Sequence, residues 1–191
     1  MTQQHSWACA LALAALAAAA APAQASTELV VNGGFEQRGF AGWVQSGDSD
    51  YDAVLCDAGS AFAGSCEAYF GSLTGSSITQ TLDVGGAGRT WNLSFAFQAD
   101  EAPGSSFSVS FGGQQLTLPS LSTSAYQLYQ FSGMTTGPTM TLAFNFVDPT
   151  GTAYLDAVSV TAVPEPASLA LMGAGLAGVV LVSRRRLKRA G

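Results

Sequence analysis

The fold of this chain is decided by residues 91–97, which read Trp91-Asn92-Leu93-Ser94-Phe95-Ala96-Phe97. Large apolar side chains alternate here with small or polar ones. Because successive side chains of a β-strand point to opposite faces of the sheet, this alternation predicts a strand with one face in a core and the other outside. The same period of two recurs over residues 107–111 and 140–146.

Glycine and proline separate these runs. They cluster at residues 85–88, 103–104, 112–113, 137–138 and 148–151. Glycine supplies positive φ and proline fixes φ, so these clusters predict turns. Many short strands between turns predict an all-β fold, an antiparallel β-sandwich of the jelly-roll type, over residues 26–162.

Charge is distributed unevenly along the chain. Between Ser26 and Val163 there are twelve acids and only two cations, Arg38 and Arg89, which gives 2 − 12 = −10. The segment 184–189 carries five cations. An acidic body without clustered Lys or Arg excludes nucleic acid as a partner.

The N-terminal residues predict an export signal. Residues 7–21 are almost purely Ala and Leu, and Ala23-Gln24-Ala25 places small residues where signal peptidase cuts. We therefore expect a signal helix over residues 1–25. The first seven residues hold no Lys or Arg, which is atypical, and the alternative is a buried Ala-rich helix.

The C-terminal segment, residues 163–191, has three parts in order. Pro164-Glu165-Pro166 precedes an apolar run over 167–182, and a basic tail occupies 184–189. As a helix the apolar run measures about 24 Å, against about 30 Å for a hydrocarbon core, so it predicts a short single transmembrane helix. The basic tail is expected to stay cytoplasmic.

This segment resembles the PEP-CTERM sorting signal of Gram-negative bacteria. The matching residues are Pro164, Glu165, Pro166 and the cluster Arg184, Arg185, Arg186. The resemblance implies processing by an exosortase, a transient stay in the inner membrane, and delivery to the cell surface or extracellular polymer matrix. The alternative is a permanent single-span anchor.

The body resembles the galactose-binding-like jelly rolls that include many carbohydrate-binding modules. The likeness rests on the opening Asn32-Gly33-Gly34-Phe35-Glu36 and the closing Leu155-Asp156-Ala157-Val158. In those families a structural Ca²⁺ often joins the opening and closing strands, which implies Glu36 and Asp156 as ligands. The alternative is that both carboxylates only accept backbone hydrogen bonds or face solvent.

Sugar-binding modules stack aromatic rings on sugar faces. The candidates for binding extracellular polysaccharide in this way are Trp43, Tyr51 and Tyr69. Trp43 is equally a candidate for the core.

Two cysteines remain once the signal peptide is removed with Cys9. In an oxidising compartment Cys56 and Cys66 are expected to form one disulfide, with two free thiols as the alternative.

The body offers little for catalysis. The only histidine is His5, and residues 26–163 contain no Lys, which excludes a Ser-His-Asp triad and a Cys-His pair. Carboxylate pairs drawn from Glu36, Glu67, Asp100 and Glu101 leave hydrolysis of glycans as the least favoured reading. We therefore expect an exported, non-catalytic protein that binds glycan, or alternatively a structural or adhesive surface protein without a small ligand.

Overall fold

The computed structural model describes residues 27–57, 59–100, 103–118 and 123–163, together with Gly173 and Gly175, both of which are helical. The predicted signal peptide, the Pro-Glu-Pro motif and the predicted basic tail lie outside the described residues. The helix predicted over 167–182 also lies outside them, except for the two glycines. Within the described part of the chain, no helix combines the length and apolar character needed to cross a membrane.

The described residues form ten β-strands. These are β1 (Val44–Gly47), β2 (Ala53–Leu55), β3 (Glu67–Phe70), β4 (Ser76–Asp83), β5 (Thr90–Ala99), β6 (Ser106–Phe111), β7 (Gln114–Leu118), β8 (Thr123–Met134), β9 (Thr139–Val147) and β10 (Ala153–Ala162). The three alternating runs of the sequence become β5, β6 and β9.

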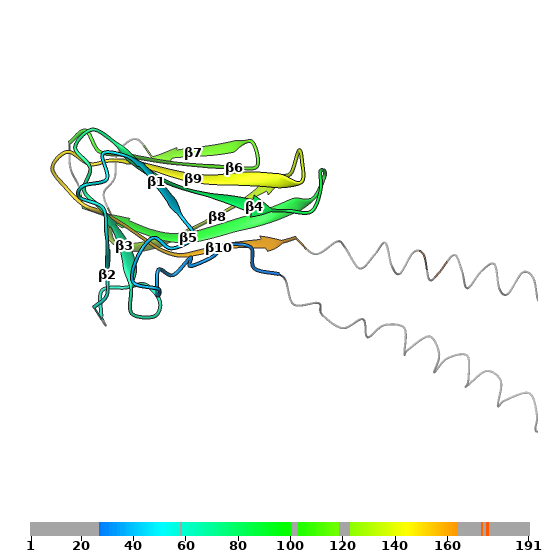
Figure 1. Cartoon of the computed structure of the whole chain (residues 1–191), viewed down its shortest axis with the longest axis horizontal. Coiled ribbons are helices and arrows are strands. Elements are labelled where there is room, and N and C mark those ends of the chain that lie inside the picture. Colours follow the sequence, from blue (N-terminus) through cyan, green and yellow to red (C-terminus); the bar gives the residue numbers. More distant parts are fainter. Residues whose placement is uncertain are drawn as a thin grey trace, which may run out of the picture.

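Two five-stranded sheets face each other (Figure 1). The first sheet has the order β1-β4-β9-β6-β7 and the second the order β2-β3-β10-β5-β8. Every strand pair is antiparallel. Because the chain passes repeatedly from one sheet to the other, the strands interleave as in a jelly roll, which confirms the predicted fold class.

The core lies between the two sheets and is built largely from phenylalanine. The rings of Phe70 and Phe146 stack with their centroids 3.7 Å apart, and those of Phe97 and Phe107 stack at 4.2 Å. Each of these pairs joins a strand of the second sheet to a strand of the first. The inward positions of β5 are buried while Thr90 and Asn92 are exposed, as the alternation predicts.

The opening segment of the domain lies against its last strand. Glu28 forms a bridge to Thr161, and the Val158 amide donates to the Gly33 carbonyl over 2.9 Å. A Cβ on Gly33 would lie 1.9 Å from the Val158 carbonyl oxygen, so only glycine permits this approach. The ten strands of the described residues and the core between them lie within residues 28–162.

Candidate functional site

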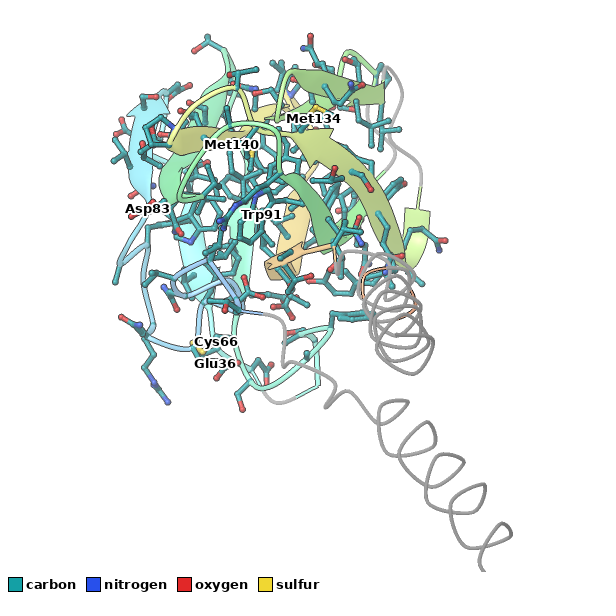
Figure 2. All side chains as sticks on the ribbon, turned by 90° about the vertical axis from the view of Figure 1, so that its right-hand side faces the viewer. Glu36, Cys66, Asp83, Trp91, Met134 and Met140 are labelled. Carbon is teal, nitrogen blue, oxygen red and sulfur yellow. A yellow bond between two sulfur atoms is a disulfide. The ribbon has the colours of Figure 1, made fainter. Side chains whose placement is uncertain are left out.

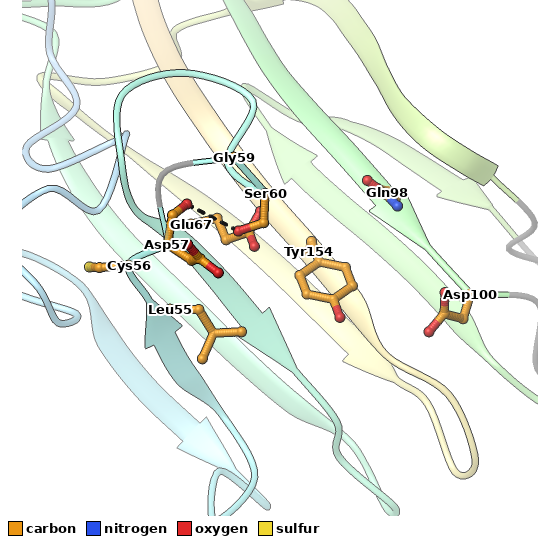
Figure 3. A pocket seen from close by; sticks show the side chains of 9 residues that line it. All are labelled: Leu55, Cys56, Asp57, Gly59, Ser60, Glu67, Gln98, Asp100 and Tyr154. Carbon is orange, nitrogen blue, oxygen red and sulfur yellow. Dashed lines mark hydrogen bonds between the residues drawn. The ribbon is translucent and has the colours of Figure 1, made fainter.

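A hollow of about 710 Å³ opens on the outer face of the second sheet (Figure 3). Its floor crosses four strands, because Tyr154 of β10 pairs with Gln98 of β5 on one side, and β3 and β2 follow on the other. The side chains that line it are Leu55, Cys56, Asp57, Ser60, Glu67, Gln98, Asp100 and Tyr154, with Gly59 completing the wall. Sites for small ligands typically measure roughly 300–1,000 Å³, so the hollow is large enough for part of an oligosaccharide.

One wall of this hollow is a loop closed by a disulfide. Cys56 and Cys66 are bonded, which confirms the predicted pairing. Two carboxylates, those of Glu36 and Asp156, accept hydrogen bonds from backbone amides of this loop. Glu36 Oε1 accepts hydrogen bonds from the amides of Ser65 and Cys66 over 2.7 and 2.9 Å, and Asp156 Oδ2 accepts one from Ala63 over 2.8 Å. Figure 2 shows Glu36 beside Cys66 at this end of the sandwich.

Glu36 and Asp156, the residues predicted to bind calcium, differ in their surroundings. The backbone amides of Ser65 and Cys66 lower the pKa of Glu36, which is exposed. Asp156 is fully buried, and burial raises its pKa although the amides of Ala63 and Ala157 oppose the shift. The two acids lie on either side of Gly34, where a Cβ would be 3.8 Å from Asp156 Oδ1 and 3.9 Å from Glu36 Cγ.

Only part of this oxygen set is free for a hard cation, because both oxygens of Asp156 already accept hydrogen bonds from the backbone amides of Ala63 and Ala157. Both acids supply oxygen, Glu36 Oε2 has no hydrogen-bond partner in the described part of the chain, and a buried carboxylate gains from a nearby positive charge. No group of three or more Asp, Glu, His or Cys side chains converges on one point among the described residues. Backbone carbonyls or water would therefore supply the remaining ligands.

Glu67 is the most deeply buried of the acids that line the hollow. Its side chain is only 2% exposed, and its Oε2 accepts a hydrogen bond from the Tyr126 hydroxyl. Burial, followed by this hydrogen bond, raises the pKa of Tyr126. The Tyr126 ring in turn packs edge-on against Phe62 of the disulfide loop at 5.6 Å. Strand β8 is thereby connected to the wall of the hollow.

The aromatic side chains predicted to stack on sugar have three different fates. Trp43 is 6% exposed, stacks on Phe35 and donates its Nε1 hydrogen to the Asn32 carbonyl, so the prediction of a sugar platform at Trp43 is wrong. Tyr51 is 58% exposed but does not line the hollow. Tyr69 is half-buried on β3, with its ring edge-on to Tyr154 at 5.7 Å.

Tyr154 is the aromatic residue of the hollow that sequence reasoning missed. A signal was available, because Tyr154 stands between Ala153 and Leu155, two apolar residues of a predicted strand. If those two face the core, Tyr154 must face outward. The catalytic candidates Glu67 and Asp100 also line the hollow, whereas Glu101 lies outside the described residues.

A second, smaller hollow of about 290 Å³ lies further along the same face. Its polar lining comes from Asn92 and Ser94 of β5, Gln130 and Ser132 of β8, and Thr161 of β10. All five side chains are uncharged and can both donate and accept hydrogen bonds.

Comparisons with known proteins concern two features of the chain, its C-terminal sorting motif and the fold of its body. Residues 162–186 match the PEP-CTERM protein-sorting motif, as predicted. This motif indicates an exported, membrane-anchored precursor in a Gram-negative bacterium. No curated protein sequence matches the chain.

Solved structures of carbohydrate-binding modules share the fold. The module TmCBM61 in complex with β-1,4-galactotriose is 15% identical, with a TM-score of 0.59, 71% of this chain covered and 98% of that chain. Family 16 Carbohydrate Binding Module-2 is 14% identical, with a TM-score of 0.53 and coverage of 69% and 98%. The CBM22-1 xylan-binding domain of Paenibacillus barcinonensis Xyn10C is 16% identical, with a TM-score of 0.53 and coverage of 75% and 99%. At these identities the likeness establishes the fold.

Proposed function

We propose that this protein is an exported, non-catalytic glycan-binding protein of the cell surface or extracellular polymer matrix, and that its ligand occupies the hollow beside Tyr154. The observation that carries the proposal is the hollow itself, where one aromatic ring stands among side chains that can hydrogen-bond to sugar hydroxyls. The sorting motif and the fold shared with carbohydrate-binding modules support it.

The lining residues can make two kinds of contact with a sugar, ring stacking and hydrogen bonds. The Tyr154 ring offers an apolar surface to the C–H face of a sugar ring. The Gln98 amide can donate to one hydroxyl and accept from another, and the carboxylates of Asp57 and Asp100 accept from further hydroxyls. Asp100 is oriented by the Thr152 hydroxyl, which donates to its Oδ2 over 2.6 Å.

A glycan array tests this function. Residues 26–163 in oxidised form are screened as wild type, Tyr154→Ala and Tyr51→Ala. We expect binding to at least one polysaccharide class, at least about tenfold weaker in Tyr154→Ala, as for loss of a main contact residue. Tyr51→Ala is the matched control, since Tyr51 is exposed away from the hollow. Unchanged binding in Tyr154→Ala would place the ligand elsewhere, and a wild type that binds no glycan would leave the structural or adhesive role.

We also propose that Ca²⁺ binds between Glu36 and Asp156 and stabilises the junction of the opening segment with β10. Bound only in the folded state, the ion would raise the melting temperature. We expect Ca²⁺ to raise the melting temperature of the wild type and to leave that of Glu36→Gln unchanged. An equal rise in both proteins, or none in the wild type, would exclude this site.

A further inference from the structure

The hollow beside Tyr154 is charged with one sign only. Its charged lining residues are Asp57, Glu67 and Asp100, and no Lys or Arg of the described residues lines it. Neither cation of the body is a lining residue of the hollow. Arg38 lies near Glu36, and Arg89 lies near the turn at Gly85, where its Nη1 would be 3.5 Å from a Cβ on that glycine. The net charge of the lining residues themselves is therefore negative, which favours positively charged ligands.

Each of these acids keeps an oxygen free for a ligand. Glu67 Oε2 accepts a hydrogen bond from the Tyr126 hydroxyl, while Glu67 Oε1 makes no hydrogen bond within the described residues and is not one of their fully enclosed unpartnered atoms. Asp100 likewise uses Oδ2 for Thr152 and leaves Oδ1 without a partner in the same part of the chain. A ligand that donates a charged hydrogen bond would gain at these free carboxylate oxygens.

The spread of the acids distinguishes between kinds of cation. Side-chain ligands that share one metal ion converge on one point, and Asp57, Glu67 and Asp100 do not form such a group within the described residues. Asp57 belongs to the disulfide loop, Glu67 to β3 and Asp100 to the end of β5, so they stand around a hollow of about 710 Å³. This arrangement suits a larger molecule that carries positive charge on extended groups.

From this arrangement we infer that the preferred ligand is a glycan with free amino groups, in which unacetylated amino-sugar units place an ammonium against Glu67 and Asp57. The inference rests on the glycan-binding function proposed above and specifies its substrate class. Anionic glycans, such as those built from uronic acids, are repelled by the same three carboxylates. Neutral glycans can contact Tyr154 and Gln98 and donate hydroxyls to the carboxylates, but they bring no positive charge into the hollow.

Calorimetry with residues 26–163 tests this inference. The ligands are glucosamine oligomers, N-acetylglucosamine oligomers of equal length, β-1,4-galactan oligomers and polygalacturonate, with poly-lysine as a polycation without sugar. We expect the unacetylated oligomers to bind at least about tenfold more tightly than the acetylated ones, which corresponds to about 1.4 kcal/mol. The preference should fall as the pH rises and the amines lose their protons.

Two variants and a matched control connect this preference to the hollow. Asp57→Asn and Glu67→Gln should each reduce the preference for the unacetylated oligomers, and Asp57→Asn serves even if Glu67→Gln fails to fold, because Asp57 is exposed. Asp83→Asn removes the same charge from β4 of the first sheet, where Asp83 only accepts a hydrogen bond from the Gly85 amide, and should leave the preference intact.

The outcomes separate the two proposals. Equal affinity for acetylated, neutral and unacetylated oligomers would overturn the amino-sugar inference and leave glycan binding standing. Equal affinity for poly-lysine and glucosamine oligomers would overturn it in favour of unspecific attraction of polycations. Failure to bind any glycan in the panel, with the array also negative, would remove the proposed function itself.

Discussion

The two sheets of this sandwich are alike on their inner faces and different on their outer faces. Both contribute buried aromatic side chains to one core. On the outside, the central strands of the first sheet present small uncharged groups, such as Thr81, Ser110 and Thr141. The second sheet presents Glu67, Gln98 and Tyr154 around a hollow. The inner faces therefore form the core that stabilises the fold, and the outer face of the second sheet carries the hollow to which we assign ligand binding.

Truncation of Phe146 tests the shared inner face and should have the largest effect. Phe146 is 2% exposed and stacks on Phe70 from the opposite sheet. We expect Phe146→Ala to lower the free energy of unfolding by about 3–5 kcal/mol, measured by urea denaturation. Thr141→Ala, on the exposed side of the same strand, should change it by about 0.5 kcal/mol or less. Similar losses in the two variants would contradict the assignment of faces.

Removal of the disulfide should lower the stability of the domain and also disturb the hollow on the second sheet. Because the bond closes a loop with a sequence separation of 10, Cys56→Ser with Cys66→Ser should lower the free energy of unfolding by about 2–3 kcal/mol. Glycan affinity should fall as well, since Asp57 and Ser60 belong to the closed loop. Reduced wild-type protein should behave like the double variant. Unchanged affinity would show that the loop is not part of the binding site.

Loss of the Tyr126 hydroxyl tests how much the Tyr126–Glu67 hydrogen bond on the outer face of the second sheet contributes to the free energy of unfolding. Tyr126→Phe leaves Glu67 Oε2 without its donor, which should cost about 1–3 kcal/mol in the free energy of unfolding. The control is Ser77→Ala on the first sheet, which removes an exposed hydroxyl contact with Ser46 at 2.8 Å and should cost about 0.5 kcal/mol or less. If both variants lost equally little free energy of unfolding, the Tyr126–Glu67 hydrogen bond would contribute no more to stability than the exposed Ser46–Ser77 contact.

The turn between β9 and β10, which connects the two sheets, should show the smallest effect, and a stabilising one. Asp148 is 1% exposed, and its Oδ1 accepts from the Gly151 amide while its Oδ2 has no partner in the described residues. Burial raises the pKa of Asp148 above its value in the unfolded chain. The folded state therefore favours the protonated form, and the charged form costs stability at neutral pH.

Asp148→Asn keeps the acceptor for Gly151 and removes the charge. We expect it to raise the free energy of unfolding by about 1 kcal/mol at pH 7. The gain should shrink as the pH falls through the pKa of the folded protein and vanish below that of the unfolded chain. Melting temperatures of both proteins across this range provide the measurement. A gain that persists in acid would show that the cause is not the buried charge.

Much of the fold could be predicted from local sequence because period-two alternation is a local property. Residues 91–97, 107–111 and 140–146 became β5, β6 and β9 with their predicted faces. The disulfide could also be predicted, since two cysteines in an exported domain allow one pairing. Alternation does not show whether an aromatic residue outside a regular alternating run lies in the core or on the surface. The sequence therefore left Trp43 open between the core and a sugar-stacking position, and Tyr154 was missed.

By itself the sequence determined the sorting motif, the strand-forming runs and the excess of acidic residues, because each depends on residue types at short spacing. The binding face was decided only by the tertiary structure. Tyr154, Gln98 and Glu67 come from three strands far apart in the chain, and the registers of β10 with β5 and with β3 bring them together. Such registers arise from packing of the whole core, in which Phe146 and Phe70 must meet, and no local pattern records them.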